Sequence, residues 1–329
     1  MDHNLDYSKS PKVCSIQIVN TCFMKCKMCY SWQKQKDSKR MDKELNIAEW
    51  ESFLDSLREI TPAGTPVSFT GGGEPLYREG IFELIEYATK KGFIAQLPSN
   101  GYLIDQDIAK RLADAGLCGL TLSLDSLNEK THDFLRGVDG TFLRVMKAIG
   151  YLRRNKIGFS LMTTIMEKNL NDILELVDWA KKERIGIRFQ AVSRPFDKDL
   201  ACDWHEQDEW KFLWPQDNVK AARLIDELIS LKNSGYEILN PVGQLEIFKA
   251  YFEKPRRPYR LRRCNVGDYL MNMDIFGNLN PCYSIGIWGN IKETKIRDLW
   301  FSQKAQAFRE EIYNCQKPCH HLINCFYEE

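Results

Sequence analysis

The sequence predicts an α/β fold in which strands and helices alternate around a parallel sheet. Short runs rich in β-branched residues alternate with longer segments whose apolar residues recur at spacings of three and four. The connecting segments are long enough for crossover helices, which is typical of repeated β-α units. This alternation extends from residue 15 to residue 192.

Six strands and five intervening helices account for this region. The strands are expected at 15–20, 67–70, 94–97, 120–124, 158–165 and 185–192. The helices between them are expected at 47–60, 81–91, 107–115, 142–153 and 170–183. Parallel β-α folds bind their ligands at the carboxyl ends of the strands, so the residues that directly follow each strand are the first candidates for a site.

The remainder of the chain follows a different pattern. Residues 193–263 contain three tryptophans and two further expected helices, at 219–232 and 245–252. We expect this region to link the two main parts and to face the substrate. We expect its tryptophans to fill the seam between these parts rather than to stack on a ligand. They are Trp204, Trp210 and Trp214.

A separate C-terminal module is expected over residues 264–329. Its predicted strands, 269–275 and 279–282, flank Phe276-Gly277-Asn278, a good hairpin turn, and a helix is expected at 304–312. The chain is therefore expected to have four parts. They are a tail at 1–14, a β-α part at 15–192, a linking region at 193–263 and the module at 264–329.

Composition excludes several classes of protein. A chain of 329 residues allows about two domains. The 46 Lys and Arg against 45 Asp and Glu leave a net charge of +1, so we expect neither nucleic acid nor a membrane surface as a partner. No apolar run approaches the roughly 18 residues of a membrane span. The polar N-terminus has no features of a signal peptide, which indicates a cytoplasmic protein.

The eleven cysteines are the unusual part of the composition. An odd total cannot pair completely as disulfides within one chain, and clustered thiols in a reducing compartment usually serve metal or redox chemistry. Eight of them form two blocks, near the two ends of the chain. Cys14, Cys118 and Cys202 stand alone, and we interpret them as small buried hydrophobic residues.

The first block, Cys22-x3-Cys26-x2-Cys29, follows the first predicted strand. Three thiolates at this spacing can reach one metal centre, because thiolate is the soft ligand that iron-sulfur clusters and zinc prefer. No fourth ligand is nearby. This suits a [4Fe-4S] cluster with one iron open to a ligand, and the alternative is a zinc site whose fourth ligand comes from elsewhere.

This block resembles the C-x3-C-x-φ-C motif of radical S-adenosylmethionine (SAM) enzymes, with Met28 at the φ position. The resemblance implies a partial (β/α)6 barrel. It implies that the open iron chelates the amino and carboxylate groups of SAM. It also implies that one electron cleaves SAM to methionine and a 5′-deoxyadenosyl radical, which takes a hydrogen atom from the substrate.

Further segments resemble SAM-binding motifs of the same family. Gly72-Gly73-Glu74-Pro75, after the second strand, is similar to the segment that holds the amino group of SAM. The segment after the third strand, with Ser99 and Asn100, is similar to the family's S/T-N-G motif. Ser123, Asp125 and Arg136 resemble the positions that hold the ribose and carboxylate of SAM.

Arginine suits a carboxylate because its planar fork can donate two parallel hydrogen bonds. The sixth predicted strand departs from the family pattern, because Arg188-Phe189-Gln190 does not match the family's adenine-binding glycine segment.

The second cysteine block combines Cys264-x17-Cys282 with Cys315-x3-Cys319-x5-Cys325. It resembles the auxiliary-cluster module of radical SAM enzymes, called SPASM with two clusters and Twitch with one. The ligands are too few for two full clusters, so we expect a Twitch-like module with one auxiliary [4Fe-4S] cluster. Cys264 and Cys282 are its first two ligands, and two of the other three complete it.

A structural zinc knuckle that uses His320 or His321 is the alternative for this block.

The resemblance implies an enzyme, a radical SAM oxidoreductase or epimerase. About fourteen residues precede the barrel, which leaves no room for a fused leader-peptide-binding domain. We therefore expect oxidation or epimerisation of a small polar metabolite, a sugar or an aminocyclitol. The alternatives are a maturase that modifies a peptide or protein, and a non-enzymatic binding module stabilised by zinc.

Two further features accompany the enzyme interpretation. A low-potential electron donor, such as a flavodoxin or a ferredoxin, is the expected protein partner. Cys202 lies in the region that we expect to face the substrate. It is either a hydrogen donor to a substrate radical or an inert cysteine.

Overall fold

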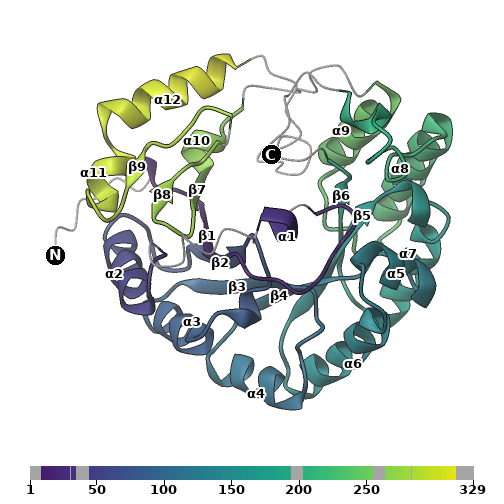
Figure 1. The fold of residues 1–329 in the computed structure, drawn as a ribbon, viewed down its shortest axis with the longest axis horizontal. Helices are drawn as coiled ribbons and strands as arrows, with labels where there is room; N and C mark the ends of the chain where they lie inside the picture. Colours follow the sequence, from purple (N-terminus) through teal and green to yellow (C-terminus); the bar gives the residue numbers. More distant parts are fainter. Residues whose placement is uncertain are drawn as a thin grey trace.

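The computed structural model describes residues 9–29, 31–34, 44–193, 203–254, 264–282 and 284–315. Nine strands in this part of the chain form a single sheet, in the order β6-β5-β4-β3-β2-β1-β7-β8-β9. The first six strands curve into an arc with helices around its outer side (Figure 1). The sheet is not closed, because β6 and β9 are its two edges. None of the helices described has the length and hydropathy that a membrane span requires.

The six strands expected from the sequence are all present and each pairs in parallel with the next. This confirms the partial barrel. The strands are β1 (Val13–Val19), β2 (Pro66–Gly71), β3 (Ile94–Ser99), β4 (Gly119–Ser123), β5 (Phe159–Ile165) and β6 (Ile187–Ala191).

The five expected helices also form, each between two consecutive strands. They are α2 (Ile47–Arg58), α3 (Ile81–Lys90), α4 (Gln106–Asp114), α6 (Thr141–Arg154) and α7 (Ile173–Glu183). A further helix, α5 (Glu129–Arg136), was not predicted. It buries His132, Asp133 and Arg136 and so lacks the apolar stripe that reveals a helix in sequence.

Alternation along the strands divides the barrel into an apolar outer layer and a polar inner face. In β1, Cys14, Ile16 and Ile18 are buried in the core, whereas Ser15 and Gln17 remain partly exposed. Successive side chains of a strand point to opposite faces, so the second set faces away from the helices. The other strands add polar residues to this inner face: Ser68, Thr70, Gln96, Thr121, Ser123, Ser160, Thr164, Arg188 and Gln190.

The C-terminal module extends the barrel sheet instead of forming a sheet of its own. Strand β7 (Leu270–Met273) pairs in parallel with β1, and Cys14 lies opposite Met271. Strands β8 (Asn278–Leu279) and β9 (Gly289–Asn290) continue the sheet in antiparallel pairing. The expected hairpin is therefore present, and Gly277 supplies the positive φ of +85° in its turn.

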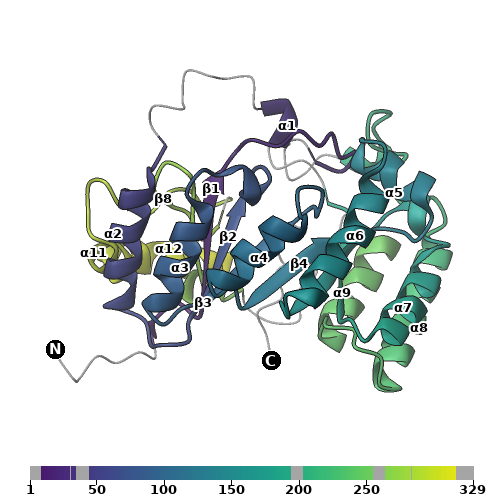
Figure 2. The same ribbon diagram turned by 90° about the horizontal axis from the view of Figure 1, so that it is seen from below.

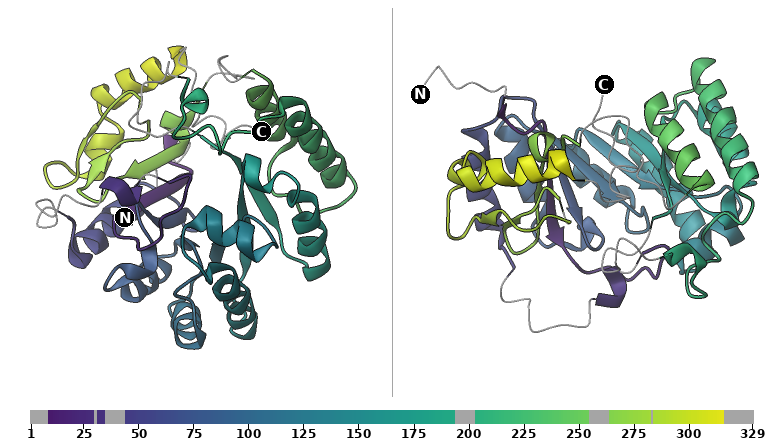
Figure 3. Two further views of the ribbon diagram at one scale, coloured as in Figure 1. Left: turned by 45° about the vertical axis from the view of Figure 1, so that its right-hand side comes forward. Right: turned by 90° about the horizontal axis from the view of Figure 1, so that it is seen from above.

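The remaining helices flank the two edges of the sheet. Figure 3 shows α8 (Asn218–Asn233) and α9 (Val242–Glu253) side by side in green, and Figure 1 shows α9 near β6, α11 (Ile296–Trp300) near β9, and α12 (Gln303–Asn314) on the same side of the molecule as α11. The short elements are α1 (Ser31–Lys34), α10 (Val266–Tyr269), η3 (Pro75–Tyr77), η4 (Glu167–Asn169) and η5 (Trp204–Glu206).

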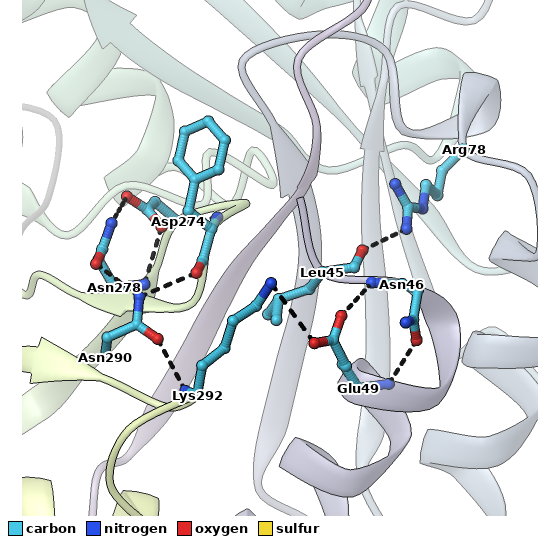
Figure 4. A network of polar contacts seen from close by, with 9 residues as sticks. Leu45, Asn46, Glu49, Arg78, Asp274, Asn278, Asn290 and Lys292 are labelled. Atoms are coloured by element: carbon cyan, nitrogen blue, oxygen red, sulfur yellow. Dashed lines mark hydrogen bonds and ion pairs between the residues drawn. The ribbon is translucent and has the colours of Figure 1, made fainter. Parts of the chain in front are cut away.

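A polar network joins the hairpin of the module to the start of α2 (Figure 4). Lys292 Nζ lies 3.5 Å from Glu49 Oε1, and Glu49 Oε2 accepts a hydrogen bond from Asn46 N at 2.8 Å. The backbone N–H of Leu45 donates to Ile275 O at 2.9 Å. The module is thus held against the barrel by side-chain and main-chain contacts together with the β1–β7 pairing.

The tryptophans of the linking region are buried, and the contacts described here are with α9 of the same region, so their place in a seam between the two main parts stays a prediction. Trp204, Trp210 and Trp214 are at most 5% exposed. The ring of Trp214 lies 5.0 Å from that of Tyr251 and 5.4 Å from that of Phe252, both in α9. These side chains pack η5 and the segment after it against α9, so they are core residues rather than a surface for stacking a ligand.

Candidate active site at the carboxyl ends of the strands

Residues 20–29, which we call the cluster loop, follow β1 and contain the first cysteine block. Figure 2 shows that the loop leads to α1 at one end of the barrel, beyond the end of β1. Lys27 N donates to Leu135 O in α5 at 2.8 Å, and Cys29 N donates to Cys26 O at 3.1 Å. Trp32 Nε1 donates to the same Cys26 oxygen at 3.2 Å. The loop is therefore fixed through its main chain.

Glycine is required where other elements approach the cluster loop. A Cβ atom on Gly73 would lie 2.0 Å from Thr21 O, and one on Gly137 would lie 2.2 Å from Lys25 O. Both oxygens belong to the main chain and cannot move aside as a flexible side chain can. The close approach allows Glu74 N to donate to Thr21 O at 2.9 Å. The glycine segment after β2 is thus packed directly on the cysteine loop.

Glu74 connects three of the predicted segments. Its carboxylate is buried, and it accepts hydrogen bonds from Ser99 Oγ and Asn100 N, both at 2.8 Å. Burial raises the pKa of Glu74 to about 7, although these hydrogen bonds act in the opposite direction. A buried carboxylate of this kind is a ready partner for a cationic group such as the ammonium of SAM.

The thiols of the cluster loop occupy an environment that opposes their ionisation. Burial is the main cause that raises the pKa of Cys22 to about 12 and that of Cys26 to about 11, and the charge of Cys29 raises both further. Asn100 Nδ2 lies 3.9 Å from Cys22 Sγ, within reach of a weak hydrogen bond. Thiolates gathered here require a positive centre to balance them, and an iron-sulfur cluster supplies iron for that purpose.

Arg136 and Asp125 meet beside Cys26. Arg136 Nη2 lies 2.8 Å from Asp125 Oδ2, and the guanidinium lies close enough to Cys26 for each group to shift the pKa of the other. Arg136 Nε is buried and has no hydrogen-bond partner among the described residues. This unused donor fits the carboxylate of SAM, which would lie next to the open iron of a cluster. The residues present therefore fit both the cluster and SAM.

Sequence reasoning missed His132, whose ring contacts the main chain of Asp125. Asp125 N donates to His132 Nδ1 at 3.2 Å, and Thr164 N donates to Asp125 Oδ1 at 3.0 Å. Burial lowers the pKa of His132 to about 3, and the charge of Arg136 adds to this effect. His132 lies four residues before Arg136 in α5, and only recognition of that helix could have placed it beside Asp125.

Two other predicted residues lie at the same end of the barrel. Ser123 is the last residue of β4 and is partly exposed on the inner face. Met28 lies in the cluster loop and packs against the hydrophobic core.

Three cysteines of the second block are described, and all are partly buried. Cys264 precedes α10, Cys282 follows the hairpin, and Cys315 caps the C-terminal end of α12. Helix α10 packs on the end of α12: Arg309 Nε donates to Gly267 O at 3.2 Å, and Tyr313 donates to Asp268. These contacts bring the segments of Cys264 and Cys315 to the same part of the module. Cys319, Cys325, His320, His321 and Cys202 lie outside the described residues.

The two lone cysteines that the structure describes differ from each other. Cys14 is fully buried in β1, as expected. Cys118 is exposed, so the interpretation as a buried residue was wrong for this position. It lies in the turn that leads into β4, where its sulfur is 3.5 Å from Gly116 O.

Comparison with known proteins identifies both parts of the chain. The model of the radical SAM superfamily matches residues 16–180, and that of an iron-sulfur cluster-binding domain, SPASM, matches residues 264–326. The chain is 31% identical over 313 residues to an AdoMet-dependent heme synthase of Methanosarcina barkeri, covering 92% of this chain and 85% of that protein.

Two other proteins illustrate the range of relatives. An Fe-coproporphyrin III synthase of the same organism is 33% identical over 184 residues, which is 56% of this chain and 44% of that protein. The structure of SuiB from Streptococcus suis, bound to the precursor peptide SuiA, superposes with a TM-score of 0.69 at 19% identity, covering 92% of this chain and 67% of SuiB. This last likeness concerns the fold alone.

The family fixes the cofactor chemistry of the site. Radical SAM domains use SAM with a [4Fe-4S] cluster, and SPASM domains bind auxiliary iron-sulfur clusters. From its two matching models and its alignment with heme synthase along nearly the whole length, we conclude that this chain is a radical SAM enzyme with a C-terminal SPASM domain.

Proposed function

We propose that Cys22, Cys26 and Cys29 hold the SAM-binding [4Fe-4S] cluster. The support is their position on a loop fixed by α5 and by the glycine segment, at the end of the barrel where parallel β-α folds bind ligands. When SAM is bound at the reduced cluster, the pair supplies a 5′-deoxyadenosyl radical that abstracts hydrogen from a substrate C–H bond. A low-potential protein such as a flavodoxin or a ferredoxin is the proposed electron donor.

The side chains around the loop would orient SAM. Arg136 would hold its carboxylate through the unused Nε donor, while Asp125 and His132 keep the guanidinium in place. Glu74 would face its ammonium group. The other contacts are assigned to Met28, Gly72, Gly73, Ser99, Asn100 and Ser123, which lie on the same loop or at the ends of β2, β3 and β4.

The proposed domain organisation remains that of the sequence: a tail at 1–14, the barrel at 15–192, a linking region at 193–263 and the auxiliary domain at 264–329. One auxiliary [4Fe-4S] cluster is proposed for the last part. Cys264 and Cys282 would bind it with two of Cys315, Cys319 and Cys325, and the packing of α10 on α12 supports the inclusion of Cys315.

For the substrate we propose an iron porphyrin that carries carboxylate side chains. The single observation that supports this is the alignment with a heme synthase, which extends through the barrel and the auxiliary domain. The expected sugar or aminocyclitol gains no support from the relatives named above. The peptide alternative has the fold likeness to SuiB in its favour, but a likeness at 19% identity concerns the fold and gives no information on the substrate.

The test is an anaerobic reaction of the reconstituted enzyme with SAM, dithionite and Fe-coproporphyrin III. We expect 5′-deoxyadenosine and a tetrapyrrole product of changed mass, both measured by liquid chromatography with mass spectrometry. The Cys26→Ala variant is the control and is expected to form neither. If 5′-deoxyadenosine forms and the porphyrin is unchanged, the substrate assignment is wrong. If no 5′-deoxyadenosine forms, the assignment of the cluster ligands is wrong.

A further inference from the structure

One strand of the barrel carries a charge that the SAM site does not use. Arg188, in β6, is the only Asp, Glu, Lys, Arg or His in the nine strands that the structure describes. Every other polar residue of the inner face is a neutral amide or hydroxyl. A charge placed on a partly buried surface is unfavourable unless an opposite charge or hydrogen-bond acceptor balances it.

The alternation in β6 places Arg188 on the inner face. Ile187, Phe189 and Ala191 are at most 2% exposed and belong to the core shared with the helices, whereas Arg188 and Gln190 are partly exposed. Strand geometry therefore directs the Arg188 side chain to the opposite side from the helices, into the barrel.

The register of the sheet places Arg188 level with the SAM site. Ser123 lies opposite Met162 in β5, and Met162 lies opposite Arg188 in β6. The three residues form one row across neighbouring strands, and two strand spacings amount to about 10 Å. Ser123 ends β4 directly before the segment that contains Asp125. Arg188 is therefore beside the site and is separated from it by Met162.

Arg188 differs from the buried Arg136 and Arg309 in having no counter-charge among the residues that the structure describes. Arg136 has Asp125, and Arg309 Nε lies 3.1 Å from Asp268 Oδ1. No carboxylate or hydrogen-bond acceptor among the described residues contacts the Arg188 guanidinium. Burial alone acts on this group and lowers its pKa. An arginine held this way has all its donors available to a ligand that enters the barrel.

We propose that Arg188 binds a carboxylate of the substrate and thereby holds the substrate next to SAM. A planar guanidinium can form two parallel hydrogen bonds to a carboxylate, and a partly desolvated pair is stronger than one in water. The inference rests on the proposed function for the presence of the substrate in the barrel. It deepens that function, because a porphyrin with carboxylate side chains satisfies Arg188 and a neutral sugar does not.

The first experiment measures binding of Fe-coproporphyrin III and of SAM to the reconstituted parent enzyme and its Arg188→Gln and Arg188→Lys variants. We expect Arg188→Gln to weaken porphyrin binding about 10- to 100-fold, the range for a lost charged hydrogen bond, without changing SAM binding. Arg188→Lys should recover part of the loss. The matched control is Arg153→Gln, which removes an exposed arginine paired with Glu183 and should change neither affinity.

The outcomes separate the two proposals. Unchanged porphyrin binding in Arg188→Gln overturns the role of Arg188, and so does a loss of SAM affinity as large as the loss for the porphyrin. If the parent itself binds no porphyrin, the proposed substrate is wrong. A second measurement then still tests whether Arg188 binds a carboxylate.

That second measurement is modification of Arg188 by phenylglyoxal, followed by peptide mass spectrometry. Tricarballylate, a small tricarboxylate, should slow the modification of Arg188, and its triamide should not. Equal modification rates with and without tricarballylate would overturn the anion site whatever the substrate is.

Discussion

Arg136 and Asp125 form a buried ion pair, with Arg136 Nη2 2.8 Å from Asp125 Oδ2, directly beside Cys26. The side chain of Asp125 is fully buried and that of Arg136 is 11% exposed. A buried pair of this kind is costly to desolvate, and removal of one partner leaves an uncompensated charge. The pair is thus a poor way to gain stability, and the unused Nε of Arg136 supports its proposed role in SAM binding.

Replacement of Arg136 by Gln is expected to weaken SAM binding about 10- to 100-fold, because one charged hydrogen-bonding group contributes about 1.5–3 kcal/mol. The same change leaves Asp125 unpaired, so the free energy of unfolding should fall by about 3–5 kcal/mol. Isothermal titration with SAM and urea denaturation measure the two effects.

The double variant Asp125→Asn/Arg136→Gln separates binding from folding. It removes both charges together, so most of the lost stability should return while SAM binding remains weak. Recovery of SAM affinity together with stability would show that Arg136 acts only on the fold.

Cys26→Ala should remove the SAM-binding cluster. About four irons per chain should be lost, and reductive cleavage of SAM should stop. Cys118→Ala is the matched control, because Cys118 is an exposed thiol outside both cysteine blocks. Its iron content and cleavage rate should equal those of the parent. Iron and sulfide analysis and the yield of 5′-deoxyadenosine provide the measurements, and an equal loss of iron in both variants would contradict the assignment.

Cys282→Ala tests the auxiliary cluster separately. Cys282 follows β8, and β8 lies on the opposite side of β1 from strands β2 to β6. The variant should lose about four irons and still cleave SAM, whereas conversion of the substrate should fall at least tenfold. A variant with the full iron content of the parent would show that Cys282 is not a ligand.

The sequence predicted the barrel because its strands and most of its helices are coded locally. β-branched runs and apolar spacings identify these elements without reference to the rest of the chain. Helix α5 was not predicted because it buries polar side chains, although Asn128 caps its start and Gly137 ends it with a φ of +69°. His132 was missed for the same reason.

Long-range pairings left no local signal. Parallel pairing of β7 with β1 joins residues 257 positions apart in the chain, and nothing in either segment specifies the partner. The sequence therefore did not reveal that the strands of the module continue the sheet of the barrel. Likewise, Arg188 stood out only as a mismatch to a family motif, and its place in a row with Ser123 required the strand register.

Gly73→Ala should disturb the site without a change in any polar group. Its Cβ would lie 2.0 Å from Thr21 O, so the glycine segment and the cluster loop must separate. Lower iron content and at least tenfold weaker SAM binding are expected. Gly150→Ala is the control, because its Cβ would meet only the flexible end of Arg154 at 3.7 Å within α6. Alanine should raise the free energy of unfolding there by about 0.5–1 kcal/mol. Normal iron content in Gly73→Ala would contradict the packing described.

Glu74→Gln should show a dependence on pH that follows from the raised pKa. The pKa of Glu74 is about 7 in the folded protein against an ordinary 4.5, so the folded state binds the proton more tightly than the unfolded state does. The contribution of Glu74 to stability is therefore full below pH 4.5 and is lost as the pH rises through 7. Gln does not titrate. The variant should gain roughly 2–3 kcal/mol on the parent in free energy of unfolding between pH 5 and pH 8.

Urea denaturation of the cluster-free proteins at four pH values between 5 and 8 measures this difference, because the remaining titrating groups are common to both. Glu183→Gln, a change at a surface residue paired with Arg153, serves as the control and should alter the free energy of unfolding by less than about 0.5 kcal/mol throughout. A difference between Glu74→Gln and the parent that stays constant with pH would mean that the Glu74 carboxylate is ionised across the range. Its hydrogen bonds from Ser99 and Asn100 would then outweigh burial.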